Sequence, residues 1–335
     1  MLAKKLSSTF LHTSAKVSNS GRKINYSVRP AKNVERKMMR DFFIRLSHLG
    51  RIEDYRYVGF GSKYFSDFII FHRYLNISEM VSIESDTTNK ERYEFNKPYS
   101  NITMKWGRST TVLPELAGSP KRTIYWLDYD GRFEEYMLHD AAIIAESISS
   151  GSVIAISFNC ESPEFSDGDL ASLQDALMKH VSKKYIPSTS DLRGWKSPRT
   201  MATFIKNCVK EEISSILENR NLSVESNNQE ISFEQKLFFT YADGAPMATV
   251  AFLFFSEGEK QAVNDCRLDD LYFIRKSDDP FDITMPNLTI KEIRHLMEIR
   301  PDESGINTKI VTLKDAQALW DNYRYFPGFS EIEAF

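Results

Sequence analysis

The sequence predicts an α/β protein with a doubly wound, mostly parallel seven-stranded sheet that ends in an antiparallel hairpin. Two observations carry this prediction. Between residues 55 and 160, short apolar runs alternate with amphipathic segments of helical period. Further along, two β-rich runs flank Asp243-Gly244, a dipeptide typical of tight hairpin turns. Because the earlier runs are apolar throughout, they indicate parallel strands covered by helices on both faces.

The elements follow one another in a regular order. An amphipathic helix is expected over 33–50, with Asn33 as its N-cap and Gly50 as its stop. Helical segments separate the five strand-like runs that come next, so consecutive strands can lie parallel. These runs are 55–59, 80–84, 101–106, 123–130 and 152–159.

The rest of the chain adds an insertion and an appendage. Residues from about 160 to 230 exceed what a crossover needs and contain helical stretches. After the hairpin, the spacing Thr289-x-x-Glu292 predicts a capped helix in a small helical appendage. We therefore expect a basic N-terminal arm and helix (1–54), a Rossmann-like domain with a helical insertion (55–256) and a helical C-terminal extension (257–335).

Composition excludes several classes of protein. Of 335 residues, 41% are hydrophobic and 27% charged, and the formal net charge is -3. This balance is typical of a globular protein and gives no overall attraction to nucleic acid. The longest apolar runs are half the length of a membrane helix. Three cysteines without a CxxC pair indicate a reducing compartment, so we expect a cytoplasmic protein.

The N-terminal end is a positive arm, because no acidic residue precedes Glu35. It could be a transit peptide, although the segment from Ile24 onward resembles part of the fold. It could also be a solvated segment lying over the domain, or a nucleic-acid or phosphate-binding arm. The residues that would serve such binding are Arg22, Lys23, Tyr26, Arg29 and Lys32.

The end of the first strand carries the first candidate site, Gly59-Phe60-Gly61 followed by Ser62. Glycines between a strand and a helix let a ligand approach the backbone. A dinucleotide fingerprint requires a third glycine where Tyr64 stands, which disfavours a bound pyrophosphate and therefore a dehydrogenase. A tight strand-to-helix corner explains the two glycines as well.

Polar residues follow the next two strands at the same predicted edge. Glu84 ends the second strand, where a carboxylate can accept both hydroxyls of a ribose. The alternative role of an acid there is a helix N-cap, which Asp86 can fill. The third strand leads into Gly107, Arg108 and Ser109.

The fourth strand ends with two acids, Asp128 and Asp130. Residues two apart on a strand share a face, so this pair could bind a cation or divide into a base and an orienting group. An Asp-Gly turn with an N-cap explains Asp130 easily and Asp128 poorly. Asp128 is therefore the expected functional acid.

In this order the motifs resemble the class I, Rossmann-like S-adenosylmethionine-dependent methyltransferases, and in particular bacterial O-methyltransferase-like proteins. "YVGFGS" is similar to their first motif, and Glu84 matches the acid on the cofactor ribose. "WGRSTTVLPEL" and "WLDYDGRFEEY" are similar to the third-strand motif and the metal-and-base strand of the catechol O-methyltransferase-like branch. "NYSVRPAKNVERKM", near the start, adds to the resemblance.

The resemblance implies methyl transfer from S-adenosylmethionine to an unidentified acceptor, expected to be a hydroxyl. Asp128 would act as base or metal ligand, with Asp130 as the second catalytic acid. Mg²⁺ is left open, because the fifth strand ends in Phe158-Asn159 where the metal-dependent branch has an Asp-Asn pair. The residues implied to bind the cofactor are Gly59, Phe60, Gly61, Ser62, Glu84, Gly107, Arg108 and Ser109.

Partners follow from the same features. We expect no membrane partner, and nucleic acid only through the basic arm. The insertion and the C-terminal helices could contact a protein partner or a second copy of the chain. The alternative function is a binding subunit of a multi-protein system, for instance in bacterial defence, that keeps the methyltransferase fold without transferring methyl groups.

Overall fold

The computed structural model describes residues 29–165, 169–188, 194–223 and 230–327. Most of the basic arm, including Arg22, Lys23 and Tyr26, lies outside the described residues.

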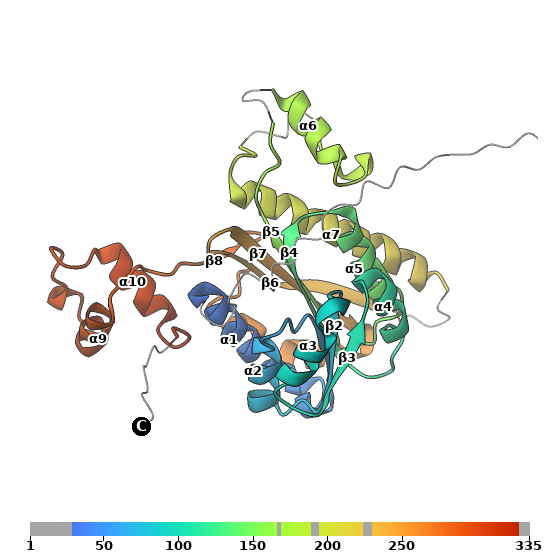
Figure 1. Cartoon of the computed structure of the whole chain (residues 1–335), viewed down its shortest axis with the longest axis horizontal. Helices are drawn as coiled ribbons and strands as arrows, with labels where there is room; N and C mark the ends of the chain where they lie inside the picture. The colour runs from blue at the N-terminus through green and yellow to red at the C-terminus, as the bar shows by residue number, and fades with distance from the viewer. Residues whose placement is uncertain (1–28, 166–168, 189–193, 224–229, 328–335) are drawn as a thin grey trace, which may run out of the picture.

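An eight-stranded sheet forms the centre of the molecule (Figure 1), in the order β3-β2-β1-β4-β5-β7-β6-β8. The first five strands pair in parallel, which confirms the predicted doubly wound sheet. They are β1 (Arg56–Gly59), β2 (Glu79–Glu84), β3 (Ile102–Trp106), β4 (Thr123–Arg132) and β5 (Val153–Asn159).

The predicted hairpin closes the sheet. Strands β6 (Ile231–Ala242) and β7 (Pro246–Ser256) are antiparallel, and Gly244 in their turn has φ +100°, a value that favours glycine. β7 also pairs antiparallel with β5. An eighth strand, β8 (Phe281–Ile283), pairs in parallel with β6, within a segment expected to be helical. Three residues are too few to show a strand period, so the sequence did not reveal this strand.

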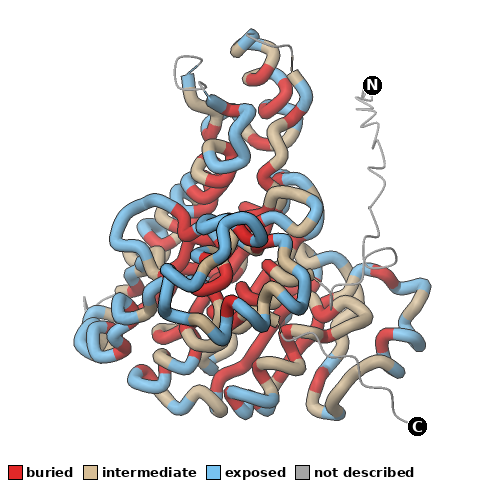
Figure 2. Tube along the Cα trace, turned by 90° about the vertical axis from the view of Figure 1, so that its left-hand side faces the viewer, coloured by how far each residue is buried: buried red, intermediate tan, exposed pale blue. Residues whose placement is uncertain are grey.

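Helices cover both faces of the sheet. On one face lie α1 (Pro30–Arg45), α2 (Ser66–Leu75) and α8 (Lys260–Asp265), and on the other α4 (Ser109–Leu116), α5 (Glu135–Ser147) and α7 (Pro198–Asn221). The short helix α3 (Lys90–Asn96) follows β2. Buried residues run through the middle of the molecule, between exposed outer surfaces (Figure 2).

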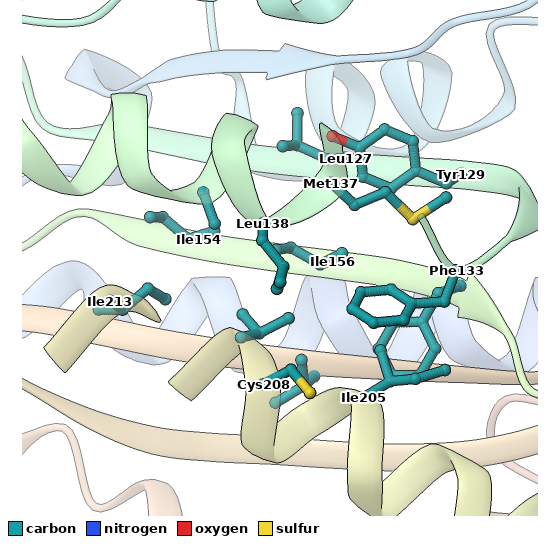
Figure 3. Packing of buried hydrophobic residues seen from close by; sticks show 14 of the residues in the cluster. Leu127, Tyr129, Phe133, Met137, Leu138, Ile154, Ile156, Ile205, Cys208 and Ile213 are labelled. Carbon is teal, nitrogen blue, oxygen red and sulfur yellow. The ribbon is translucent and has the colours of Figure 1, made fainter. Parts of the chain in front are cut away.

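The insertion contributes to the main core. Figure 3 shows Ile205 and Ile213 of α7 beside Ile154 and Ile156 of β5, with Leu138 of α5 close by. All five side chains are buried. Within the described part of the insertion, α6 (Leu170–Met178) stands away from the sheet (Figure 1). The helix α7 is therefore a structural part of the Rossmann-like core, although it lies in the insertion.

The C-terminal helices form a small lobe with its own apolar cluster. It comprises α9 (Ile290–Ile299) and α10 (Leu313–Asn322), and the predicted capping box of Thr289 and Glu292 is confirmed. The hydroxyl of Tyr325 donates to Asp41 at 2.8 Å, and Lys37 donates to the carbonyl of Tyr325 at 3.0 Å. These bonds attach the lobe to α1.

Helix α1 begins earlier than the sequence suggested, at Pro30, and Asn33 is not its N-cap. Proline fits the first helical position, and Arg29 before it supplies no side-chain cap. Instead, the backbone N–H groups of Ala31 and Lys32 donate to the carboxylate of Asp243 in the hairpin turn, at 3.2 and 2.8 Å. The turn that closes the sheet thus also caps α1.

None of the helices in the described ranges combines the length and the apolar character needed to cross a membrane.

Candidate functional site

The carboxyl ends of β1 to β5 meet at one edge of the sheet, where ligands bind in doubly wound folds. Gly59 pairs in register with Ser82 and Trp126, Glu84 pairs with Trp106, and Asp128 pairs with Ser157. The candidate residues, which are scattered between positions 59 and 130, therefore share this edge.

The glycine turn fits tightly into the protein itself. A Cβ at Gly59 would lie 2.7 Å from the hydroxyl of Tyr57, and one at Gly61 would lie 2.6 Å from the ring of Phe65. The N–H of Gly61 donates to the hydroxyl of Ser82 at 3.0 Å. Packing alone thus requires both glycines, and the corner interpretation accounts for them without a ligand.

The residues next to these glycines have distinct surroundings. Phe60 packs its ring against Tyr129, with centroids 5.2 Å apart. Ser62 has φ +46°, and its hydroxyl accepts from the N–H of Tyr64. Helix α2 starts at Ser66, and no side chain caps it among the described residues.

Glu84 lies partly exposed at the end of β2. Its Oε1 accepts from the N–H of Asp86 at 2.9 Å. Burial raises the pKa of Glu84, although hydrogen bonds from Asp86 and Tyr93 oppose this shift. Asp86 caps the following turn through the N–H of Thr88, as predicted, so Glu84 is not needed as a cap.

The end of β3 is joined to a buried acid that sequence reasoning missed. The N–H of Gly107 donates to the carbonyl of Glu84 at 3.0 Å, and Arg108 precedes helix α4. The hydroxyls of Ser109 and Tyr129 both donate to Oδ2 of Asp140, the latter at 2.6 Å. Burial raises the pKa of Asp140.

Asp128 forms an ion pair with Lys32 of α1. The distance from Nζ of Lys32 to Oδ1 of Asp128 is 2.7 Å, and the Asp128 side chain is 21% exposed. Its other oxygen, Oδ2, accepts no hydrogen bond from the described part of the chain. One oxygen of this acid is therefore held, while the side chain remains accessible.

The two acids of β4 do not share their surroundings. The pairing of β4 with β5 shifts register between Asp128 and Arg132, so the simple alternation of faces is interrupted there. The charge of Asp128 acts on the pKa values of Lys32 and Glu35, whereas that of Asp130 acts on Tyr136. Asp128 and Asp130 therefore have different charged neighbours, and a face shared by the two acids stays a prediction.

Lys32 sits at the centre of a buried polar cluster. Its Nζ also lies 2.7 Å from Oε2 of Glu35 and 3.1 Å from the hydroxyl of Tyr241. Burial by itself lowers the pKa of Lys32, but the nearby charges of Asp128 and Glu35 outweigh it, and the pKa lies above its usual value. Burial raises the pKa of Glu35, which Lys32 opposes.

This placement corrects one expectation for the basic arm. Lys32 is 3% exposed, so it cannot serve as a nucleic-acid contact on the surface. Arg29 is half-buried. The sequence carried a signal for the burial of Lys32: Lys32, Glu35, Met39 and Phe43 recur at helical spacing on one face. Similarly, Asp140 lies within the apolar stripe of α5, next to Ala141.

Two further features lie near this edge. Arg132 and Glu161 form an exposed ion pair at 3.2 Å, beyond the end of β5. In the insertion, a cleft of about 490 Å³ has one aromatic wall of Tyr185, Trp195 and Phe204. Across the described ranges, no group of three His, Cys, Asp or Glu side chains is arranged to hold a metal ion.

The fold defines a Rossmann-like protein with its candidate binding residues at the carboxyl ends of the parallel strands. A family model described as "Putative O-methyltransferase" matches residues 24–334. The chain belongs to this family, which confirms the resemblance seen in the motifs and the expectation of a methyltransferase. No curated protein matches the sequence.

Several solved structures are similar to the chain at low scores. A "putative O-methyltransferase from Klebsiella pneumoniae" is 12% identical, over 65% of this chain and 80% of that one, with a TM-score of 0.35. TomG from Streptomyces achromogenes, an O-methyltransferase in complex with S-adenosylmethionine, is 13% identical over the same shares, also at 0.35. LepI, likewise in complex with S-adenosylmethionine, is 12% identical over 63% of this chain, at 0.34, and the chain spans only 45% of its length. At such scores these likenesses have no bearing on activity or site.

Proposed function

We propose that this protein transfers a methyl group from S-adenosylmethionine to a hydroxyl of an acceptor bound above Asp128. The observation that carries the proposal is the placement of Asp128: an accessible carboxylate at the end of β4, on the same edge as Glu84 and the glycine turn. Membership of the O-methyltransferase family supports it.

The residues at this edge fit the proposed cofactor by their chemistry. Glu84 offers a partly exposed carboxylate to the two ribose hydroxyls. The turn from Gly59 to Ser62 would hold the amino-acid end of the cofactor. Gly107, Arg108 and Ser109 would lie beside its adenine. The tight packing around Gly59 and Gly61 keeps the turn rigid, which suits a preorganised site.

Methyl transfer requires few functional groups from the protein. The bound cofactor supplies an electrophilic methyl group on a sulfonium. The chain must align the acceptor hydroxyl with that group, because an in-line displacement gains most of its acceleration from orientation. Oδ2 of Asp128 can accept the hydroxyl proton, while the ion pair with Lys32 fixes the carboxylate through Oδ1. Asp130 stays a candidate for the second catalytic acid, and its charge helps to raise the pKa of Tyr136.

The acceptor side would be built by the insertion. The ring of Phe204 lies 6.4 Å from that of Phe133, which directly follows β4, so the aromatic cleft adjoins the strand that carries Asp128. The cleft combines these aromatic rings with polar and charged side chains, among them Arg199, Asn207 and Glu211, which suits an acceptor that carries both an aromatic ring and polar groups. The C-terminal extension is attached through Tyr325 to α1, the helix that covers the face of the sheet opposite to α7.

The test is methyl transfer from isotopically labelled S-adenosylmethionine to a panel of phenols, catechols and aliphatic alcohols. We expect label in at least one class of acceptor, with an equal amount of S-adenosylhomocysteine formed. If the protein binds S-adenosylhomocysteine but labels no acceptor from the panel or from a cell extract, the binding-subunit alternative replaces the proposal.

A further inference from the structure

The ammonium of Lys32 lies in a ring of oxygen atoms. Two are carboxylate oxygens, Oδ1 of Asp128 and Oε2 of Glu35, each at 2.7 Å. Two are hydroxyls, those of Tyr241 at 3.1 Å and Ser157 at 3.3 Å. Nζ also lies 4.7 Å from the ring centroid of Trp126. Carboxylates, hydroxyls and an aromatic face are the groups that stabilise a cation in proteins.

Several contacts hold Lys32 and the groups around its ammonium in place. Glu35 is 0% exposed and lies one helical turn from Lys32. The hydroxyl of Ser157 is itself held, because the indole N–H of Trp126 donates to it at 2.9 Å. The backbone N–H of Lys32 donates to Asp243, so the helix that carries the ammonium is anchored at the same residue. Lys32 therefore has no room to swing away from Asp128.

We propose that Lys32 is the built-in cation of the site: a positioning residue that holds Asp128 through Oδ1 and occupies the place a divalent metal ion would need at this acid. The proposal rests on the proposed function and decides between the two roles that the sequence left open for Asp128. With an ammonium at 2.7 Å, Asp128 serves as base, and its cation is supplied by α1.

The reaction balances with this assignment. The acceptor hydroxyl gives its proton to Oδ2 of Asp128, and its oxygen forms a bond to the methyl carbon. The bond between that carbon and sulfur breaks, and its electron pair stays on sulfur, which becomes a neutral thioether. Lys32 keeps its three protons throughout and contributes a fixed positive charge beside the carboxylate.

The experiment is a titration of the full-length protein with Mn²⁺, followed by electron paramagnetic resonance. We expect the wild type to bind no Mn²⁺ at this site at millimolar concentration. Lys32→Ala leaves two carboxylates facing an open position, and we expect it to gain one site at least ten times tighter than any in the wild type. The double variant Lys32→Ala with Asp128→Asn should lose that site again.

Lys206→Ala is the matched control. Lys206 is as buried as Lys32, at 1% exposed, and within the described residues it pairs with one carboxylate, that of Asp278, at 3.2 Å. Lys206→Ala would leave one carboxylate at this position rather than two, so no Mn²⁺ site should appear. Lys32→Arg should likewise bind no Mn²⁺, because it restores the charge.

Two results would overturn the proposal. Mn²⁺ binding by the wild type that disappears in Asp128→Asn overturns the proposal, and this arm stands even if Lys32→Ala fails to fold. A folded Lys32→Ala that binds no Mn²⁺ overturns it as well. Binding of S-adenosylhomocysteine by the wild type, measured in parallel, reports on the proposed function and not on Lys32, so the two failures are distinguishable.

Discussion

Nζ of Lys32, in the first turn of α1, lies 2.7 Å from Oδ1 of Asp128 at the end of β4. This contact joins the N-terminal helix to the strand end that carries the candidate base. It brings together two residues that lie 96 positions apart in the sequence.

Replacing Asp128 by Asn tests the base directly. We expect S-adenosylhomocysteine to bind with nearly unchanged affinity, because the acid is not proposed to touch the cofactor. Turnover should fall by about 100-fold or more, the usual contribution of a general base. Asp130→Asn serves as comparison, since Asp130 has different neighbours. Label-transfer assays measure both, and an Asp128→Asn enzyme with unchanged turnover removes this acid from the mechanism.

We expect the substitutions Gly61→Ala and Gly131→Ala to differ strongly in their effect on stability. A Cβ at Gly61 would come within 2.6 Å of the Phe65 ring and 2.7 Å of the Ser82 hydroxyl, whereas one at Gly131 meets nothing within 4 Å. Gly61→Ala should therefore cost about 1–3 kcal/mol of unfolding free energy, as overpacking does. Gly131→Ala should cost almost nothing. Urea denaturation compares them, and equal stabilities would mean that the turn relaxes freely.

The cap of α1 can be tested at Asp243. Asp243→Ala removes the acceptor of the Ala31 and Lys32 N–H groups, and we expect a loss of about 0.5–2 kcal/mol in unfolding free energy. Asp243→Asn should stay close to the wild type, because Asn is also a good cap. If the two variants unfold alike, the cap contributes no stability.

Asp140 predicts a pH effect with a definite sign. Burial raises its pKa in the folded state, so the folded protein holds the proton more tightly than the unfolded chain. The unfolding free energy should thus fall as pH rises from below the unfolded value, about 4, toward the raised folded pKa. The Asn side chain of Asp140→Asn does not ionise, so this variant should lack the fall. Its unfolding free energy should therefore increase relative to that of the wild type as pH rises.

Asp302 provides a control of opposite sign. Hydrogen bonds from Ser304 lower its pKa, so its contribution is present above the unfolded pKa and lost as pH falls. Unfolding in urea across a pH series compares the two Asn variants. A pH profile for Asp140→Asn parallel to that of the wild type would contradict the assignment.

The sheet was predictable because hydrophobic period and turn chemistry are local. Seven of the strands follow from apolar runs and from Asp243-Gly244. β8 was missed because three residues show no period, and the start of α1 because its cap, Asp243, is remote in sequence.

The site was predictable only in part. Strand ends such as Glu84 and Asp128 are marked by a polar residue after an apolar run, and topology brings them to one edge. Lys32 was taken for a surface residue because lysine is rarely buried without a partner. Its partners, Asp128 and Tyr241, become neighbours only when α1 docks on the sheet.

Binding of the cofactor at this edge through Glu84 can be measured by calorimetric titration with S-adenosylhomocysteine. We expect one site in the wild type and a roughly 10- to 100-fold weaker one in Glu84→Gln, because hydrogen bonds to a charged group contribute about 1.5–3 kcal/mol. Glu79→Gln, at the opposite end of β2 and paired with Lys121 at 2.6 Å, should bind like the wild type. A wild type that binds neither S-adenosylmethionine nor S-adenosylhomocysteine would show that this edge is not a cofactor site.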